Sequence, residues 1–514
     1  MSKPKKVAVI GAGWAGTASA LSLHKQGFHV TVFESAHLLG GRARGVQDNI
    51  FGMLDNGQHL MLGAYEETLK LIAQLNPNIP EDQLLVREPL YLMSASGDIH
   101  LKAKNFWPAP FNTLMGLLAA KGLSWVDKIS MFRLMVALVS SKPTQKTHTK
   151  QATQPNLKNS SLHSPATQNK DSHPFSEENP TVLQWLRQQK QSSHVIQKVW
   201  QPLCLAMLNT PIEVGCAQLF KTVLRDSLGS STAGATDIVL PRIDLSTLAP
   251  QRLVDLLDCR LGKTVRKIVC SENTIEIDGE HFEGCIIATP PHNTLRLIKE
   301  SLKHTATHEK LVHELSQFTY APITTCYMRL SKPFELPAPM LMLSESPDRG
   351  HIGQWLFQRQ SQDSQEKNAQ ACDLAIIMSD SFGLSDDTSE VSRLLAHELP
   401  NNLLDEALSN SIEVMPSAHR KNAHLAQALH QQIAEQLMQR PGYANQTLPA
   451  LKTFRIITEK RATFVARPGL ERPSNFTGDA RIMLAGDWTD TGYPAVIEGA
   501  VQSGLNAARG LFSF

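Results

Sequence analysis

The chain has 514 residues, of which 42% are hydrophobic and 19% are charged, so it is too long for one ordinary domain and apolar enough to fold around large cores. Its 50 basic and 48 acidic side chains leave a net charge of +2, which excludes a nucleic-acid-binding protein that relies on bulk positive charge. The 7 cysteines are dispersed without a C-x-x-C pair, which argues against a disulfide framework and a metal site and fits a reducing cytoplasm.

The N-terminal segment lacks the pattern of a secretion signal. Its apolar run Val7–Ile10 meets glycine at once, whereas a signal core needs roughly 7–15 apolar residues. The most apolar longer stretch, Phe106–Leu138, is interrupted by the charged residues Lys121, Asp127, Lys128 and Arg133. A spanning helix needs about 18 uninterrupted apolar residues. We therefore expect a cytoplasmic protein, with peripheral contact at the inner face of the cell membrane as the alternative.

The first predicted elements form a dinucleotide-binding unit. A buried strand Val7–Ile10 leads into Gly11-Ala-Gly13-Trp14-Ala15-Gly16, a helix is expected over Thr17–Gln26, and a second strand over Phe28–Phe33 ends at Glu34. In this G-x-G-x-x-G pattern the first glycine permits a tight turn, the second lets the backbone approach a pyrophosphate, and the third lets the helix pack on the strand. The helix N-terminus offers N–H groups to phosphates, and the Glu34 carboxylate suits ribose hydroxyls.

A glycine pair shortly after the second strand indicates which dinucleotide is bound. Nicotinamide-binding domains carry no element like Leu39-Gly40-Gly41-Arg42, in which glycine amides can contact pyrophosphate or flavin and Arg42 can pair with phosphate. The whole series resembles the amine oxidase and phytoene desaturase superfamily of FAD enzymes, and this resemblance implies FAD as the cofactor. The superfamily usually has an arginine where this chain has Leu38.

Two blocks, near residues 66–236 and 298–479, are rich in helical periodicity and are predicted to form a helix-rich α+β substrate-binding domain. Within the first block, Ser140–Pro180 is dominated by polar residues and proline, which predicts a disordered insertion because such a segment buries too little apolar surface. The insertion could be a solvated tether or, alternatively, a regulatory or docking segment.

The remaining pieces complete the cofactor domain by resemblance. A strand ending in Gly486-Asp487 precedes a small-residue helix that begins at Ile497. In the superfamily the matching acid binds the ribityl chain, the helix start faces the flavin pyrimidine ring, and the position of Val265, in an expected strand Thr264–Cys270, contacts adenine through its backbone. The implied fold is α/β, with a discontinuous FAD-binding Rossmann-like domain of glutathione-reductase type built from residues 1–65, 237–297 and 480–514.

Four further blocks carry a closer resemblance, namely Asp55-Asn-Gly57-Gln58-His59, Trp200–Leu203, Asp237–Ser246 and Ala485–Pro494. They look like the squalene-associated FAD-dependent desaturases, now understood as hydroxysqualene dehydroxylases of bacterial squalene and hopanoid synthesis. This resemblance implies reductive dehydroxylation of hydroxysqualene, an isoprenoid that needs a long apolar tunnel.

The same resemblance places the Asp55–His59 segment along the isoalloxazine, with Gly57 and Gln58 among the cofactor contacts. Asp55 and His59 are then the candidate catalytic residues, as donors of the proton with which the hydroxyl leaves as water. The alternative is structural: Asp55 caps the turn at Asn56 and Gly57, and His59 is a hydrogen-bonded core residue.

Three other functions stay open. A carotenoid or phytoene-type desaturase would remove hydride instead of giving it. An amine oxidase is disfavoured because Val496 stands where such enzymes often have a tyrosine, and a non-enzymatic prenyl-binding escort protein is disfavoured by the intact cofactor motifs. Upstream enzymes of the squalene pathway are candidate partners. Residues Phe106–Val136 are predicted either to dip into one membrane leaflet as an interfacial helix pair or to pack as ordinary core helices.

Overall fold

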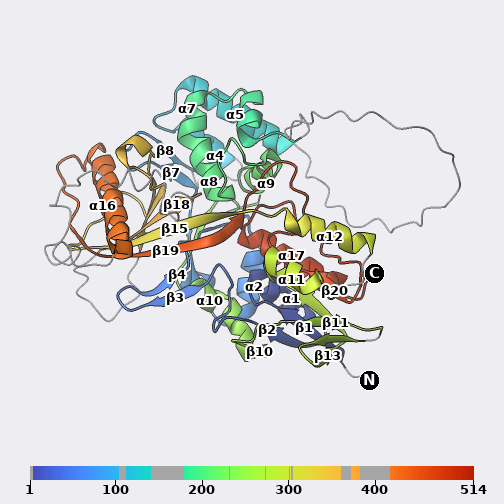
Figure 1. Cartoon of the computed structure of the whole chain (residues 1–514). Coiled ribbons are helices and arrows are strands. Elements are labelled where there is room, and N and C mark those ends of the chain that lie inside the picture. Colours follow the sequence, from blue (N-terminus) through green and yellow to red (C-terminus); the bar gives the residue numbers. More distant parts are fainter. Residues whose placement is uncertain are drawn as a thin grey trace, which may run out of the picture.

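The structure is a computed structural model that describes residues 4–103, 111–140, 179–359 (apart from 231, 273, 300 and 302–304), 372–381 and 417–513. The expected disordered insertion 140–180 therefore lies outside the described residues except at its ends. Figure 1 shows one body of strands and helices that contains both ends of the chain and a second body built on the long strands β15 and β19.

A five-stranded parallel sheet in the order β10-β2-β1-β14-β20 forms the centre of the first body. Its strands come from three distant parts of the chain: β1 (Lys6–Ile10), β2 (His29–Phe33), β10 (Asp258–Arg260), β14 (Gly284–Ile287) and β20 (Ile482–Leu484). The apolar runs of β1, β14 and β20 are continuous because both faces of a parallel sheet are covered. The strands predicted near residues 7–10, 28–33 and 481–485 are confirmed.

Different elements pack on the two faces of this sheet. Val7 and Val9 share a core with α1 (Trp14–Lys25) and α17 (Ile497–Gly510), whereas Ala8 and Ile10 belong to a core that includes the small antiparallel sheet β11-β12-β13. The strands of that sheet are β11 (Ile268–Cys270), β12 (Ile275–Ile277) and β13 (Glu280–Phe282). The expected strand Thr264–Cys270 begins only at Ile268, and Val265 lies in the segment without regular secondary structure before it.

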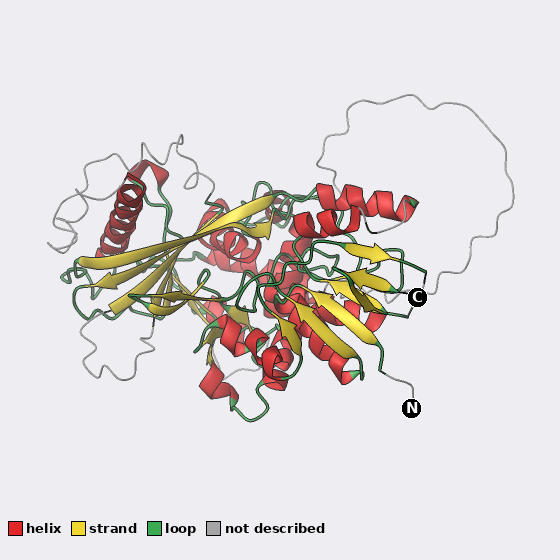
Figure 2. Ribbon diagram, turned by 60° about the horizontal axis from the view of Figure 1, so that its bottom comes forward, coloured by secondary structure: helices red, strands yellow, loops and turns green. Residues whose placement is uncertain are grey.

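The second body is built on a five-stranded antiparallel sheet in the order β16-β17-β18-β15-β19 (Figure 2). Its strands are β15 (Tyr320–Leu330), β16 (Met340–Met342), β17 (Trp355–Arg359), β18 (Cys372–Ser379) and β19 (Leu451–Phe464). Alternate residues such as Cys326, Leu356 and Ile376 pack in one core with α16 (Ser417–Met438). The periodicity of residues 298–479 did not reveal this sheet, because its central strands are buried on both faces and lack polar alternation.

Helices close the second body on the side away from α16 (Figure 1). They are α4 (Phe111–Leu118), α5 (Trp125–Ser140), α6 (Val182–Gln188), α7 (Ser193–Val195), α8 (Gln201–Leu208) and α9 (Ala217–Leu228). The remaining helices include α2 (Glu66–Leu75), α3 (Glu81–Leu84), α10 (Leu245–Leu248), α11 (Pro291–Lys299) and α12 (Ala306–Ser316). The remaining strands are β3 (Gly45–Asp48), β4 (Gly52–Asp55), β5 (Met61–Leu62), β6 (Leu85–Glu88), β7 (Tyr91–Met93), β8 (His100–Lys102) and β9 (Ile238–Pro241).

Candidate active site

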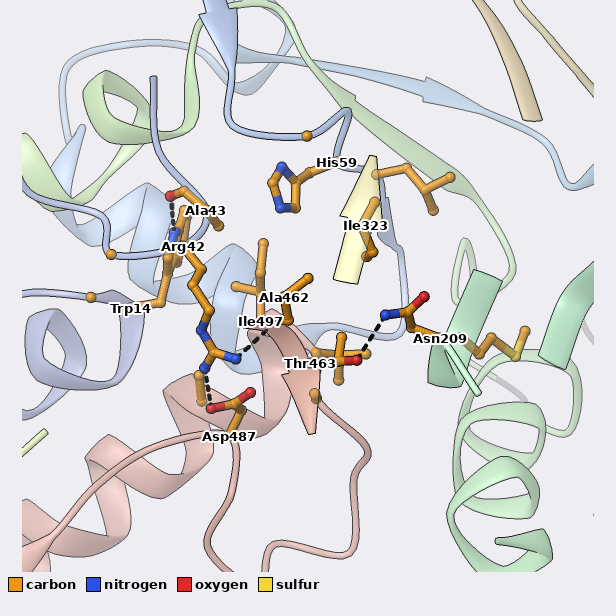
Figure 3. Close-up of a pocket in the computed structure, with 18 of the residues that line it drawn as sticks. Trp14, Arg42, Ala43, His59, Asn209, Ile323, Ala462, Thr463, Asp487 and Ile497 are labelled. Carbon is orange, nitrogen blue, oxygen red and sulfur yellow. Dashed lines mark hydrogen bonds and ion pairs between the residues drawn. The ribbon is translucent and has the colours of Figure 1, made fainter. Parts of the chain in front are cut away.

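One cavity of about 610 Å³ reaches from the glycine-rich loop after β1 to helices α4 and α5. Its wall combines residues of the parallel sheet, the antiparallel sheet and the helices that close the second body (Figure 3). The wall contains nearly all of the predicted cofactor residues: Gly11, Gly13, Trp14, Ala15, Glu34, Gly40, Gly41, Arg42, Gly57, Gln58, Val265, Gly486, Asp487 and Ile497.

Gly16 is the one predicted cofactor residue that does not border the cavity. A Cβ atom on Gly16 would lie 1.9 Å from the carbonyl oxygen of Gly11, so the start of α1 packs directly on the turn that follows β1. This is the packing role that the third glycine of the motif was predicted to have.

The geometry at this end of the cavity fits FAD. Gly13 and Gly41 face each other closely, since a Cβ on Gly41 would lie 3.1 Å from the Cα of Gly13, and any side chain at either position would fill the cradle between the two loops. The Glu34 carboxylate accepts hydrogen bonds from the N–H groups of Ala12 (2.8 Å) and Ala36 (2.9 Å). These bonds fix the carboxylate at the end of β2, where a ribose-binding acid belongs.

Arg42 and Asp487 form an ion pair across the cofactor end of the cavity. The Arg42 Nη2 donates to Asp487 Oδ1 over 2.5 Å, and its Nη1 donates to the Ala462 carbonyl over 2.9 Å (Figure 3). Burial opposes the charge on Arg42, but the neighbouring Asp487 outweighs it and raises the arginine pKa. The structure thus joins two side chains that were predicted to contact different parts of the cofactor.

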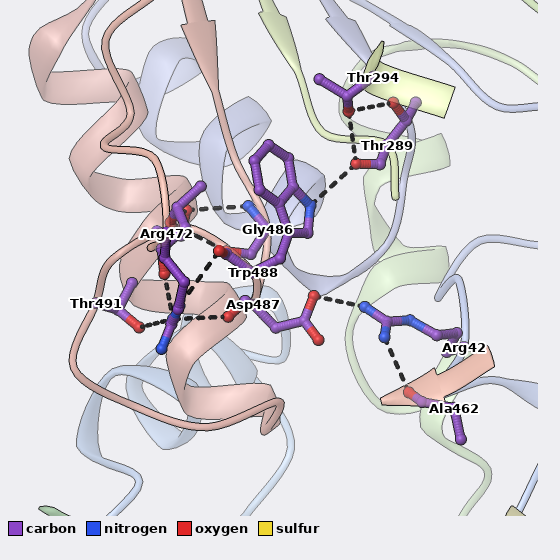
Figure 4. Close-up of polar contacts among 11 residues, drawn as sticks. Arg42, Thr289, Thr294, Ala462, Arg472, Gly486, Asp487, Trp488 and Thr491 are labelled. Carbon is purple, nitrogen blue, oxygen red and sulfur yellow. Dashed lines mark hydrogen bonds and ion pairs between the residues drawn. The ribbon is translucent and has the colours of Figure 1, made fainter. Parts of the chain in front are cut away.

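Arg472 organises the loop that carries Asp487, and no sequence motif pointed to it. Its buried guanidinium donates to the carbonyl oxygens of Asp487 (3.0 Å), Trp488 (3.3 Å), Thr489 and Tyr493 (2.6 Å) (Figure 4). Burial lowers the pKa of Arg472 to about 10. Four of its five partners are main-chain carbonyls and the fifth is the Thr491 hydroxyl at 3.4 Å, so the residue types of the partners do not reveal this role in the sequence.

The N-terminus of α17 opens onto the cavity. Val496 is the N-cap residue and supplies no side-chain hydrogen bond, and Val496, Ile497 and Ala500 all border the cavity. Uncapped N–H groups and the positive end of the helix dipole therefore face this space, where they favour negative charge. Val265, whose backbone is predicted to contact adenine, borders the cavity, and its carbonyl oxygen accepts a hydrogen bond from Arg296 over 3.0 Å.

His59 borders the cavity in the segment predicted to pass along the flavin (Figure 3). Burial lowers the pKa of His59 to about 4, the nearby Gly57 backbone opposes this shift, and the positive charge of Arg42 adds to it. The imidazole is therefore neutral near pH 7, and its Nδ1 atom is buried without a partner among the described residues. His59 can offer or accept one hydrogen bond in the cavity.

Asp55 does not border the cavity, although its neighbours Asn56 to Leu60 do. Its Oδ1 accepts from the Leu245 N–H over 3.3 Å, and its backbone carbonyl accepts from the Tyr327 hydroxyl over 2.8 Å. Burial raises the pKa of this carboxyl to about 7. In the structure Asp55 therefore joins β4 to the start of α10 and to β15.

The raised pKa of Asp55 predicts a pH-dependent contribution to stability. An aspartate in the unfolded chain titrates near pH 4, so the folded protein holds the Asp55 proton between about pH 4 and 7 while the unfolded chain releases it. This contribution is complete below about pH 4 and is lost as the pH rises through 7. When the pH rises from 5 to 8, the parent chain should therefore lose roughly 2–3 kcal/mol more unfolding free energy than the Asp55→Asn variant.

Urea unfolding at both pH values measures this difference. Glu66→Gln, at the exposed start of α2, is the matched control and should keep the parental pH dependence. An Asp55→Asn variant with the same loss of stability as the parent would contradict the assignment.

Beyond the cofactor end, the cavity continues as an arm with an apolar wall. This apolar arm is lined by Leu90, Leu92, Leu101, Leu117, Met131, Met135, Val199, Trp200, Leu203, Met207, Met340, Trp355, Phe357 and Ile377. The described part of the chain holds no cluster of three or more His, Cys, Asp or Glu that could bind a metal ion, and its cysteines are all free thiols. No described helix has the length and apolar character needed to cross a membrane.

Comparison with known proteins gives a family and a fold. Residues 14–511 match the family described as flavin containing amine oxidoreductase. A hydroxysqualene dehydroxylase from Sinorhizobium fredii is 24% identical over 533 aligned residues that cover 98% of each chain. A 15-cis-phytoene desaturase from an Oncidium hybrid cultivar is 22% identical over 99% of this chain and 78% of its own. A solved structure of a putrescine oxidase double mutant superimposes with a TM-score of 0.61 at 14% identity, over 99% of both chains.

Proposed function

The chain belongs to the flavin containing amine oxidoreductase family, and we propose that it is an FAD-dependent dehydroxylase that reduces hydroxysqualene to squalene. The family match confirms the predicted superfamily, the flavin cofactor and the oxidoreductase class. The α/β fold with its parallel sheet, predicted from the sequence, is confirmed by the structure and by its likeness to the oxidase.

The apolar arm of the cavity is the observation that supports a long apolar substrate. Its side chains are leucine, methionine, valine, isoleucine and aromatic residues, and it is continuous with the part of the cavity that holds the cofactor motifs. Each methylene buried there contributes about 0.8 kcal/mol, so a long isoprenoid chain can bind without charged contacts. The side chains of this arm carry no charge, and the carboxylates of the cavity wall, Glu34, Glu459 and Asp487, are not among them. The likeness to a hydroxysqualene dehydroxylase over the whole chain supports the same class.

The reaction needs a proton, a dry cavity and a two-electron donor. The C–O bond breaks, the oxygen takes up a proton and leaves as water, and the remaining allylic cation must be kept from other water. When bound in its fully reduced form, FAD would supply the hydride and, in the overall balance, the proton, so that the alcohol and the reduced flavin give the hydrocarbon, water and oxidised FAD. The apolar arm excludes competing water, and His59 is the polar side chain that we assign to the cofactor end of the cavity, as a neutral hydrogen-bonding group.

A carotenoid-type desaturase is the alternative, because a phytoene desaturase is also similar over most of this chain. The two activities run in opposite redox directions, so one pair of incubations separates them. The purified flavoprotein with a flavin reductant should convert hydroxysqualene to squalene, detected by gas chromatography. Conversion of phytoene with an electron acceptor, and no squalene from hydroxysqualene, would favour the desaturase.

We also propose that the outer faces of α4 and α5 bind a lipid surface. Trp125 and Val126 are 69% and 71% exposed, and Ile129, Phe132 and Val136 continue the exposed apolar stripe of α5 at helical spacing. The opposite side of the same helix places Met131 and Met135 in the cavity wall. One helix layer thus separates the exposed apolar stripe from the apolar arm, which suits a substrate that dissolves in lipid.

Charge at this surface favours anionic headgroups. Lys128 Nζ lies 5.1 Å from the ring centroid of Trp125, and Lys121 and Arg133 are exposed nearby in sequence. The one acid of α5, Asp127, is buried and accepts hydrogen bonds from the side chains of Ser124 and Ser192. Cations therefore face outward beside the apolar stripe while the acid is turned inward, as in helices that bind membrane surfaces.

A double substitution tests the lipid surface. Trp125→Ser with Val126→Ser should lower binding to vesicles that contain phosphatidylglycerol by at least about 10-fold, because both side chains bury apolar area in the headgroup region. Flavin content should not change. The matched control is Val254→Ser with Leu256→Ser, two exposed apolar residues near β10 that should leave vesicle sedimentation unchanged. Equal loss in both double variants would contradict the assigned surface.

A further inference from the structure

Among the described residues, the buried indole N–H of Trp355 has no hydrogen-bond partner, whereas those of three other buried tryptophans do. The Nε1 atoms of Trp14, Trp200 and Trp488 donate to Ala43, Gln191 and Thr289 over 3.1, 2.9 and 3.1 Å. The Trp355 side chain is equally buried, but its Nε1 has no hydrogen-bond partner among the described residues. An unsatisfied buried donor costs on the order of 1–3 kcal/mol, so its presence calls for a bound partner.

The register of the antiparallel sheet places Trp355 on the cavity side. Trp355 of β17 is paired with Ile377 of β18, and Ile377 is paired with Thr325 of β15. Paired residues on neighbouring antiparallel strands point to the same face of a sheet. Trp355 and Ile377 both border the cavity, so the row Thr325–Ile377–Trp355 faces it.

One end of this row touches the segment predicted to pass along the flavin. A Cβ on Gly57 would lie 3.9 Å from the Thr325 Oγ1 and 3.6 Å from the His59 Cε1. Two strand spacings, about 10 Å, separate Thr325 from Trp355 along the row. The Thr325 Oγ1 and His59 Nδ1 atoms are also buried without partners among the described residues. The row therefore leads from the cofactor segment to a free N–H donor in the apolar arm.

The surroundings of Trp355 do not favour water as the missing partner. Its strand neighbours on this face are Met342 and Ile377, and Met340 and Phe357 occupy the next row. A buried water needs 2–4 polar partners, which these side chains do not supply. A long apolar ligand with a single oxygen would satisfy the N–H and fill the arm.

We propose that the indole N–H of Trp355 donates a hydrogen bond to the hydroxyl oxygen of the substrate and so positions its C–O bond in the apolar arm. The inference rests on the proposed function and deepens it. It predicts that the site binds a long-chain isoprenoid alcohol more tightly than the matching hydrocarbon. Trp355 is a positioning residue in this scheme.

The test compares an alcohol with a hydrocarbon on the flavin-loaded protein. Trp355→Phe keeps an aromatic ring and removes only the N–H donor and part of the ring volume. We expect hydroxysqualene to bind about 5- to 10-fold more weakly to the variant, as for one lost hydrogen bond. Squalene should bind equally well to both proteins. Affinities are read from ligand-induced changes in the flavin absorption spectrum, without turnover.

A second measurement separates loss of the hydrogen bond from misfolding of the variant. In ¹⁵N-tryptophan-labelled protein, the indole resonance that is missing in Trp355→Phe should shift when hydroxysqualene binds and stay unchanged with squalene. Trp185→Phe, at a buried tryptophan that does not border the cavity, is the matched control and should lower thermal stability without changing the preference for the alcohol. Trp355→Phe should lose only the packing free energy of the smaller ring, since its N–H has no partner among the described residues to lose.

Equal weakening of both ligands by Trp355→Phe, or no weakening of either, would overturn the inference. Failure of the proposed function looks different: the parent chain would release no squalene from hydroxysqualene, whatever the ratio of the two affinities.

Discussion

Gly13→Val should abolish FAD binding while leaving the protein folded. Gly13 has an ordinary backbone conformation, with φ −70° and ψ −179°, and a Cβ added there would make only ordinary contacts, with the Gly41 Cα at 3.7 Å and the Gly40 carbonyl oxygen at 4.0 Å. The valine methyl groups would instead occupy the cradle between the two glycine loops, where the motif predicts the pyrophosphate. We expect FAD affinity to fall at least about 100-fold, which corresponds to roughly 2.7 kcal/mol.

Gly16→Ala provides the contrast within the same motif. Its Cβ would lie 1.9 Å from a backbone oxygen of Gly11, so this variant should lose both the flavin and the native packing of α1. Ser22→Ala, further along α1, should bind FAD like the parent. Flavin absorbance after gel filtration measures the cofactor, and circular dichroism measures the fold. A yellow Gly13→Val protein with parental affinity would contradict the placement of the pyrophosphate.

Arg472→Met should destabilise the protein by roughly 3–5 kcal/mol and release the flavin. The substitution leaves the carbonyl oxygens of Asp487, Trp488 and Tyr493 buried without their donor, and each such group costs about 1–3 kcal/mol. The loop from Asp487 to Tyr493 then loses its fixed shape, and Asp487 can no longer be held against Arg42. Denaturant unfolding and flavin content measure the two effects.

Arg472→Lys should recover only part of the loss, since one ammonium group has three donors and cannot span the carbonyls that the planar guanidinium reaches. Arg509→Met, an exposed arginine near the end of α17, is the matched control and should behave like the parent. If Arg472→Met kept its flavin and its unfolding free energy, the role assigned to this side chain would be wrong.

The parts of the fold that depend on local sequence were predictable. The strand, turn, helix and acid around Gly11 and Glu34 lie within about thirty residues, and each has a local physical cause. The cofactor contacts expected near Gly40, Asp487 and Ile497 came from a family resemblance, and the structure brings these residues to one cavity wall.

The features that escaped prediction depend on contacts between distant segments. The antiparallel sheet joins β15 to β19, about 130 residues further along the chain, and its buried faces hide the alternation that marks a strand. Arg472 binds main-chain atoms, which have no sequence signature. Asp55 sits beside the cofactor segment, but pairing with the Leu245 N–H turns its carboxyl away from the cavity wall. Spacing along the chain carries no information about these orientations.

A single-turnover experiment tests the proposed function most directly. The FAD-loaded protein is reduced without oxygen and mixed with hydroxysqualene, and flavin oxidation is followed by absorbance while the products are quantified. The account predicts one squalene for each flavin oxidised, both at the same rate. It would be contradicted if the flavin stayed reduced and no squalene formed, while the oxidised protein took up electrons from phytoene.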